Sequence, residues 1–214
     1  MAALLLLGAG GHARVVAETA LATGRFSHIS FLDDRCTGPN QLPDQLGWPV
    51  IGPFAAAFDP QICQQFSAAL VAIGNPAVRL QWLPRLVTVG YEIPVVIHPT
   101  AWLSPSAQLG VGTVVFAQAA VQSQAVIGSG AILNTGCSVD HDVQLGDGVH
   151  ICPGARLAGE VQVGDRSWIG IGSSVIQQIC IGVDVTVGAG AAVVRDLPDG
   201  ATAVGVPARV LPTV

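Results

Sequence analysis

The hydrophobic positions between residues 97 and 193 recur with a period of six. An isoleucine, leucine or valine stands at every sixth residue from Ile97 to Val193, and no residue is inserted anywhere in the run. The residue two positions before each is mostly small, and the residue after several of them is glycine. A period of six fits neither the 3.6-residue turn of a helix nor the alternation of a plain strand. The repeating unit must therefore turn a corner every six residues.

Three such units close a triangular coil, in which each side is a short parallel strand and residues eighteen apart lie in successive coils. The aliphatic residue of each unit is expected to point inward, with the small residue at the tight corner. Glycines that follow the aliphatic positions are expected where the backbone needs conformations that other residues resist, as at 110, 128, 146, 164 and 182. The pattern predicts a parallel β-helix of five to six coils.

Before the repeat, hydrophobic runs alternate with helical patterns. The first seven residues predict a buried strand that enters a glycine turn at 8–12, followed by a helix over about 13–23. Further segments are predicted as strands at 28–32, 68–73 and 92–97, a helix at about 76–86, and a loop at 35–53. Strands that alternate with helices imply a parallel sheet. The chain is therefore expected to have a small Rossmann-like α/β domain at 1–96 and a β-helix domain with a C-terminal tail at 97–214.

Ligand chemistry in the first domain is expected at the carboxyl ends of its strands. The residues found there are Gly10, His12, Asp33, Asp34, Gly74 and Asn75. Backbone amides at the start of the first helix could hold a phosphate.

A dinucleotide site is an alternative, because Gly8-x-Gly10-x-x-Ala13 nearly matches the dinucleotide fingerprint and Asp33 follows at a suitable distance. A domain of about 95 residues with four strands is small for two mononucleotide halves. A mononucleotide or nucleotide-sugar site is therefore favoured, and a purely structural turn stays open.

Composition limits the classes of binding partner and indicates the cellular compartment. A net charge of -5 and a pI near 5.3 argue against nucleic acid or an anionic membrane as partner. The five cysteines are odd in number and lack C-x-x-C spacing, which fits reduced thiols in a cytoplasmic protein. The apolar run at the start is too short for a signal peptide or a membrane span.

A cluster of polar residues interrupts the otherwise bland repeat. It consists of Asn134, Asp140, His141, Asp142 and His150. His141 stands two residues past an inward valine, so its side chain should leave the coil, where a carboxylate beside the imidazole can raise its basicity. Either Asp140 or Asp142 could be that carboxylate. Gly159 stands eighteen residues on, where it leaves space beside the imidazole and could offer a backbone N–H to an oxyanion.

The cluster has other interpretations. A solvent-facing histidine between two aspartates can be no more than a solvated corner. A zinc site built from His98, His141 and His150 is another candidate, although their spacing does not bring three ligands to one place. Cys137 and Cys152 lie nearby, but neither has an adjacent base in the sequence that would activate a thiol nucleophile.

Several short strings, in order along the whole chain, carry a family resemblance. They are Gly8-Ala9-Gly10-Gly11-His12, Phe31-Leu32-Asp33-Asp34, Ala72-Ile73-Gly74-Asn75, Ile97-His98-Pro99, Leu133-Asn134-Thr135, Asp140-His141-Asp142, His150-Ile151-Cys152-Pro153 and Gly205-Val206-Pro207-Ala208-Arg209. With the repeat, they resemble the bacterial hexapeptide-repeat sugar acetyltransferases, of the type of sialic acid O-acetyltransferase and the N-acetyltransferases of UDP-4-amino sugars. The resemblance implies a left-handed β-helix, a homotrimer with active sites between subunits, and acetyl-CoA as co-substrate with no metal.

The resemblance also implies roles for individual residues. His141 matches the general base, Asp142 the acidic residue beside it, which is often Glu in relatives, and Asn134 a polar active-site residue. Positions that match acetyl-CoA contacts are His150, Gly159, Ile171 and Ala189. Positions that match the nucleotide-sugar pocket are Gly10, Gly11, His12, Asp33, Asp34 and Gly74.

These implications predict direct acetyl transfer without a covalent enzyme intermediate, since a thioester is already activated. An amine at carbon 4 of a nucleotide-linked sugar is favoured as acceptor, with a sugar hydroxyl such as that of sialic acid as the alternative. The nucleotide base, the sugar and the pathway stay open. A protein of another class, a non-catalytic trimeric scaffold that binds nucleotide sugars, is the rival hypothesis.

Overall fold

The computed structural model describes residues 2–36 and 42–212. Contacts divide the chain into two compact units, Met1–Ile97 and His98–Val214. None of the helices in the described part of the chain is long and apolar enough to cross a membrane.

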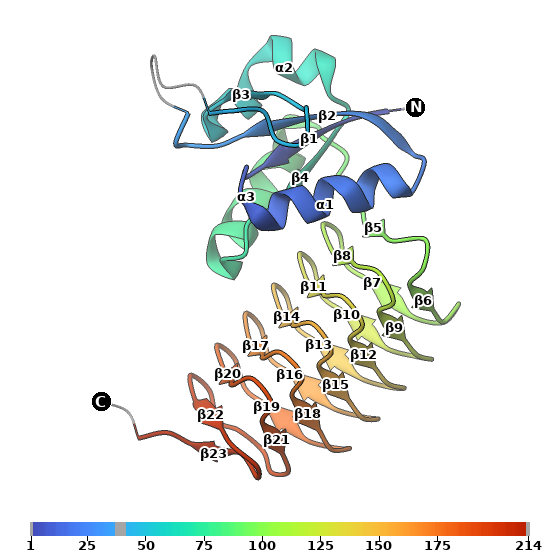
Figure 1. Ribbon diagram of the computed structural model, residues 1–214, viewed down its shortest axis with the longest axis vertical. Coiled ribbons are helices and arrows are strands. Elements are labelled where there is room, and N and C mark those ends of the chain that lie inside the picture. The colour runs from blue at the N-terminus through green and yellow to red at the C-terminus, as the bar shows by residue number, and fades with distance from the viewer. Residues whose placement is uncertain (1, 37–41, 213–214) are drawn as a thin grey trace. The chain divides into compact units, whose positions relative to one another are not determined.

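The first unit contains a four-stranded parallel sheet in the order β3-β2-β1-β4 (Figure 1). Its strands are β1 (Ala2–Leu7), β2 (Phe26–Leu32), β3 (Val50–Gly52) and β4 (Ala68–Val71). Its helices are α1 (Gly11–Ala22), the 3₁₀ helix η1 (Phe54–Phe58), α2 (Pro60–Gln65) and α3 (Pro76–Val89). Leu4, Leu5, Leu6 and Leu7 of the central strand are fully buried, as the apolar run of a sheet covered on both faces requires.

The strand order creates a switch point between β1 and β4. From β1 the chain order runs through β2 to β3 on one side, whereas β4 pairs with the other edge of β1. In open parallel sheets, ligands bind outside the carboxyl ends of strands at such a point. The segments that follow β1 and β4 there are the glycine turn before α1 and the loop Ala72–Asn75 before α3.

Two details of the predicted first unit are wrong. The strand predicted over 92–97 is reduced to an isolated bridge at Glu92 and to β5 (Val96–Ile97), because Pro94 has no amide hydrogen for a continuous ladder. The predicted loop at 35–53 contains β3, a three-residue strand too short to show a period, and residues 37–41 of that loop lie outside the described chain. Helices η1 and α2 were not predicted.

The second unit is the predicted coil of short strands, arranged in three sheets that we call sides 1, 2 and 3 (Figure 1). Its strands have two residues and pair in parallel, except for the three-residue β22 and for β23, which pairs antiparallel with β22. Side 1 contains β6 (Trp102–Leu103), β9 (Ala120–Val121), β12 (Ser138–Val139), β15 (Arg156–Leu157), β18 (Ser174–Val175) and β21 (Ala192–Val193). Side 2 contains β7 (Gln108–Leu109), β10 (Val126–Ile127), β13 (Gln144–Leu145), β16 (Gln162–Val163) and β19 (Cys180–Ile181). Side 3 contains β8 (Val114–Val115), β11 (Ile132–Leu133), β14 (His150–Ile151), β17 (Trp168–Ile169), β20 (Thr186–Val187), β22 (Thr202–Val204) and β23 (Arg209–Val210).

The register of the coil confirms the predicted repeat. Paired residues in successive coils are eighteen apart, for example Leu133 with Ile151 and Val139 with Leu157. From Val115 to Val193 the aliphatic residues point inward and are buried, and so are the small residues two positions before them, such as Ala131 and Cys137. The aliphatic residues of the first coil, at 97, 103 and 109, are only partly buried. Side 2 has five strands and side 1 has six, which agrees with five to six coils.

The glycines that follow the aliphatic residues do not adopt the special backbone conformation that was predicted for them. Left-handed backbone occurs three residues after every aliphatic position from Leu109 to Val187, at Gly136 (φ 64°) and Gly154 (φ 67°) for example, and not at the glycines that directly follow the aliphatic residue. Those glycines are instead required by close stacking of coils. A Cβ added to Gly128 would lie 2.5 Å from the carbonyl carbon of Gly146 in the next coil. Both requirements are met by glycine, but the physical causes differ.

Candidate active site

His141 and Asp142 form the turn between side 1 and side 2, after β12 and before β13. Nδ1 of His141 lies 2.8 Å from Oδ2 of Asp142, while Oδ1 of Asp140 accepts a 2.8 Å hydrogen bond from the backbone N–H of His141. The imidazole partner is therefore Asp142, and Asp140 holds the backbone of the turn. Asp142 occupies the left-handed position of its corner, with φ 57°.

The surroundings of His141 favour a basic Nε2. The hydrogen bond that His141 donates to Asp142 raises the pKa of His141. The charges of Asp140, Asp142 and Glu160 raise it further, and desolvation opposes them. When Nδ1–H donates to Asp142, the lone pair of Nε2 is left to accept a proton. Half of the His141 side chain is exposed, so a substrate can reach that lone pair.

The next coil limits the space around the imidazole. A Cβ built on Gly159 would lie only 2.4 Å from Nε2 of His141. Beside the pair is a polar cavity of about 410 Å³, lined by Asp142, Gln144, Glu160, Gln162, Gln178 and Cys180. A glycine at 159 thus leaves space beside Nε2 of His141, as predicted from the eighteen-residue spacing.

Asn134 and His150 form a second cluster on another part of the coil. Nδ2 of Asn134 lies 3.0 Å from Nε2 of His150, and Oδ1 of Asn134 accepts a 2.8 Å hydrogen bond from the N–H of Thr135. His150 is nearly buried on side 3, where its ring packs edge-on against Trp168 with a centroid separation of 4.2 Å. Because the carbonyl of Asn134 is used by the backbone, its amide donates to His150.

Ile171 and Ala189 belong with the second cluster. They occupy equivalent turns of successive coils between side 3 and side 1, the same edge on which Asn134 and Thr135 lie. Ile171 is 59% exposed, so this edge offers an apolar surface to a ligand.

The two clusters lie on different parts of the triangular coil. His141 and Gly159 occupy the corner between sides 1 and 2, and that corner is opposite side 3, which carries His150. Asn134 occupies the corner between sides 3 and 1. One chain therefore does not bring His141 and His150 together, although the two residues are only nine apart in sequence.

The cysteines near the site are held as thiols. Cys137 and Cys152 are buried, and burial raises the pKa of each to about 12. All five cysteines are free. A thiolate nucleophile is therefore disfavoured at both positions.

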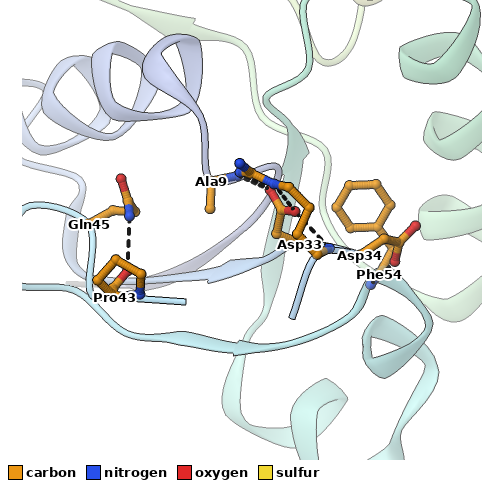
Figure 2. Close-up of polar contacts among 7 residues, drawn as sticks. Ala9, Asp33, Asp34, Pro43, Gln45 and Phe54 are labelled. Atoms are coloured by element: carbon orange, nitrogen blue, oxygen red, sulfur yellow. Dashed lines mark hydrogen bonds and ion pairs between the residues drawn. The ribbon is translucent and has the colours of Figure 1, made fainter. Parts of the chain in front are cut away.

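A second cavity, of about 470 Å³, lies within the first unit at the predicted strand ends. It is lined by Gly8, Ala9, Gly10, Gly11, His12, Asp33, Arg35, Phe54, Ala72, Ile73, Gly74 and Val78. Five of the six residues assigned to a nucleotide-sugar pocket are among them. The sixth, Asp34, does not line the cavity, and its Oδ1 accepts a 2.8 Å hydrogen bond from the N–H of Phe54 (Figure 2).

The glycine turn at this cavity brings backbone close to backbone. A Cβ on Gly8 would lie 2.7 Å from the carbonyl oxygen of Ala72, and Gly8 has φ 110°, so no other residue fits there without strain. Gly10 caps α1 without a side-chain hydrogen bond, and the first turn of α1 contains no acidic residue. The first amides of α1 are thus suited to an anionic group.

His12 lines this cavity, and the buried Arg79 lies behind it within reach of its charge. Burial, and then the charge of Arg79, lower the pKa of His12 to about 4, so its imidazole is neutral at physiological pH. Arg79 is 1% exposed and donates to the carbonyl oxygens of Ile73 (2.7 Å) and Gly74 (3.1 Å). Arg79 therefore fixes the loop that follows β4, a role that the sequence interpretation missed.

The described residues contain no group of three or more His, Cys, Asp or Glu side chains that could hold a metal. His98 contacts Thr100 within its own turn, with Nδ1 2.9 Å from the hydroxyl oxygen. His141 and His150 belong to the separate clusters described above. The three histidines weighed as zinc ligands thus have separate surroundings.

A glycine-turn α/β unit followed by a triangular coil with a histidine–carboxylate pair at one corner defines a hexapeptide-repeat transferase. The profile of the PglD N-terminal domain matches residues 3–86, and that of the bacterial transferase hexapeptide (six repeats) matches residues 124–159. The second match contains both His141 and His150.

Solved structures of similar proteins match the chain over nearly its full length. The acetyltransferase domain of PglB from Neisseria gonorrhoeae FA1090 in complex with acetyl coenzyme A is 45% identical, with 98% of both chains covered and a TM-score of 0.91. A histidine-to-alanine mutant of GDP-perosamine N-acetyltransferase from Caulobacter crescentus, in complex with CoA and GDP-perosamine, is 39% identical over 100% of this chain and 98% of that chain, with a TM-score of 0.91.

A curated relative, the UDP-N-acetylbacillosamine N-acetyltransferase of Bacillus subtilis (strain 168), is 38% identical over 112 residues. That match spans 52% of this chain and half the length of the relative. The chain belongs to the PglD-type family of hexapeptide-repeat sugar N-acetyltransferases, and its β-helix is left-handed. The predicted family and fold class are thereby confirmed.

Proposed function

We propose that this protein transfers the acetyl group of acetyl-CoA to the amino group of a nucleotide-linked 4-amino sugar. The observation that carries the proposal is the 2.8 Å contact between Nδ1 of His141 and Asp142, which leaves Nε2 basic and accessible. Relatives that match the whole chain bind acetyl-CoA, or CoA together with GDP-perosamine, which supports this choice of substrates.

The reaction proceeds by direct transfer. The neutral sugar amine attacks the thioester carbonyl, and its nitrogen becomes positively charged in the tetrahedral intermediate. Nε2 of His141 removes a proton from that nitrogen. The intermediate then collapses with departure of the CoA thiolate. The backbone N–H of Gly159 is proposed as a donor to the oxyanion. Asp142 stabilises the imidazolium that forms, and the buried cysteines take no part.

The two units divide the substrates in this proposal. The first unit binds the nucleotide in the cavity lined by Gly10, Gly11, His12 and Gly74, with phosphate at the uncapped start of α1. The coil binds CoA, with contacts from His150, Gly159, Ile171 and Ala189. Free cysteines throughout the chain suit a cytoplasmic location.

A homotrimer with active sites between coils accounts for the arrangement of the clusters. His141 leaves the coil at the corner opposite side 3, whereas Asn134 and His150 lie on side 3 and its edge. If both clusters serve one reaction, the corner of one copy must face side 3 of another. Exposed Trp168, Ile171 and Ile176 provide apolar surface for such an assembly.

A panel of acceptors tests the proposal. Purified protein is mixed with acetyl-CoA, a thiol reagent and, in turn, a nucleotide-linked 4-amino-4,6-dideoxy sugar, its 4-hydroxy counterpart and free sialic acid. Faster release of CoA with the amino sugar is expected, and mass spectrometry should show the acetyl group on nitrogen. Faster acetylation of either oxygen acceptor would contradict the amine assignment, and no turnover with any acceptor would favour a non-catalytic scaffold.

A further inference from the structure

Asp33 has no acceptor position left for a ligand. Its Oδ2 accepts from the N–H of Ala9 at 2.9 Å and from Nη2 of Arg35 at 2.9 Å (Figure 2 shows the Ala9 contact). Its Oδ1 accepts from Nε of Arg35 at 2.8 Å and from the backbone N–H of Arg35 at 3.0 Å. A carboxylate offers about four lone-pair sites, and four donors fill them here. Direct binding of substrate by Asp33 would require one of these bonds to break.

Arg35 has the capacity that Asp33 lacks. A guanidinium has five N–H donors, and the bidentate contact with Asp33 uses one on Nε and one on Nη2. Within the described chain, no hydrogen bond of Nη1 is found. The Arg35 side chain is 64% exposed and lines the 470 Å³ cavity. Arg35 therefore keeps three unused donors and an exposed guanidinium face, on a side chain that lines the cavity.

The position of Arg35 indicates which part of a nucleotide it meets. The phosphates belong at the amino end of α1, whereas Asp33 and Arg35 directly follow β2, at the carboxyl end of the adjacent strand. Asp33 also neutralises the charge of Arg35. A neutral ion pair attracts a diphosphate weakly, but its remaining N–H groups still donate to uncharged acceptors, and its face still stacks on a base.

We infer that Arg35, held in place by Asp33, contacts the nucleoside part of the nucleotide sugar, and that Asp33 is a positioning residue. The inference rests on the proposed function and reassigns a residue within it. Asp33 has its pKa lowered to about 2, chiefly by its hydrogen bond with Arg35, so the pair stays ionised at working pH. The contact acts on the ribose hydroxyls or on the base, not on the phosphates.

Binding measurements on the full chain test the inference without turnover. Calorimetry with UDP, GDP and dTDP first identifies the nucleotide that the wild type binds. Arg35→Ala is then titrated with that diphosphate, with the matching nucleoside and with inorganic pyrophosphate. Affinity for the diphosphate and the nucleoside should fall by the same factor, about 10- to 100-fold, while the affinity for inorganic pyrophosphate is unchanged. Arg25→Ala removes an equivalent charge that pairs with Glu92 outside the cavity, and should bind as the wild type does.

A double-mutant cycle tests the positioning role. Asp33→Asn keeps an oxygen for the N–H of Ala9 but loses the charged partner of Arg35, so it should weaken nucleoside binding nearly as much as Arg35→Ala. The double variant should be no weaker than Arg35→Ala alone. Additive losses would overturn the positioning role and restore direct contact by Asp33.

The remaining outcomes separate the two proposals. Unchanged nucleoside affinity in Arg35→Ala, or a loss confined to pyrophosphate and the diphosphate, would overturn the inference while leaving nucleotide binding intact. A wild type that binds none of the three diphosphates would overturn the proposed function and the inference together. Circular dichroism melts confirm that each variant is folded.

Discussion

Gly159 lies so close to His141 in the adjacent coil that no side chain fits between them. A Cβ built on Gly159 would be 2.4 Å from Nε2 and 2.5 Å from Cε1 of the imidazole. Gly159 lacks the left-handed backbone that would itself demand glycine. The requirement for glycine at 159 therefore comes from the imidazole of His141 and not from the backbone of the coil. A substitution at 159 should affect the site more than the folding of the coil.

The first prediction follows from that contact. Gly159→Ala should displace the exposed imidazole, lower kcat/KM about 10- to 100-fold, and shift Tm by less than about 2 °C. Gly164→Ala is the matched control. There the added Cβ would lie 2.7 Å from the carbonyl carbon of Gly182, which is backbone and cannot move aside, so Tm should fall by about 5 °C or more. Equal destabilisation of both variants would show that Gly159 serves the coil and not the imidazole.

The second prediction separates chemistry from packing. His141→Ala should lower kcat by about 10²- to 10⁴-fold with little change in Tm, because an exposed base supports proton transfer and not the core. Ile151→Asp should act in the opposite sense, since it places an unpaired charge at a fully buried position of β14. Turnover and thermal melts measured on both variants decide the point. A near-wild-type rate for His141→Ala would remove it as the base.

The third prediction concerns pH. The base must be deprotonated, and Asp142 raises the pKa of His141, so activity of the wild type rises with pH through that elevated value. Asp142→Asn removes the main cause of the elevation. The acid limb of kcat/KM should therefore move to lower pH, and the plateau should fall because the base is weaker. The ammonium of the sugar titrates identically with both enzymes, so the displacement belongs to His141. An unmoved acid limb would exclude Asp142 as the controlling carboxylate.

The fold was largely predictable because an aliphatic residue recurs at every sixth position, and burial of that residue determines the coil. That His141 has a carboxylate partner was also predictable from the sequence. Only the choice of Asp142 over Asp140 as that partner required the structure. The separation of Asn134 from His141 could have been found by counting, since the units that begin at Leu133 and Val139 lead into different corners.

Other features gave weaker signals. Strand β3 depends on pairing with the end of β2 and has no period of its own. Arg79 does have a signal, because it shares the buried face of α3 with Leu83 and Leu86 at helical spacing. A charged residue at a core position of a helix indicates that it pairs with a buried polar group, because charged side chains are rarely buried without a partner. The saturation of Asp33 by Arg35 is different, since it depends on rotamers that spacing does not reveal.

The fourth prediction tests the division of substrates. His12 lines the cavity of the first unit and is neutral there, with its pKa lowered to about 4 by burial. His12→Ala should raise the KM for the nucleotide sugar about tenfold or more and leave that for acetyl-CoA within about twofold. Initial rates with each substrate varied in turn give both constants. An equal rise for both substrates would contradict the assignment of nucleotide binding to the first unit.

The last prediction tests whether two copies build one site. His141→Ala and His150→Ala disable clusters on opposite parts of the coil, so each variant should be strongly impaired alone. When the two are co-refolded in equal amounts, a site between copies draws its corner from one variant and its side 3 from the other in about one quarter of cases, and roughly that share of activity should return. Asn134→Ala mixed with His150→Ala is the control. Those residues contact each other within one chain, so no combination of copies restores them. No recovery in the test mixture would place the whole reaction within a single coil. Recovery in the control would show instead that Asn134 and His150 do not act as a pair within one chain.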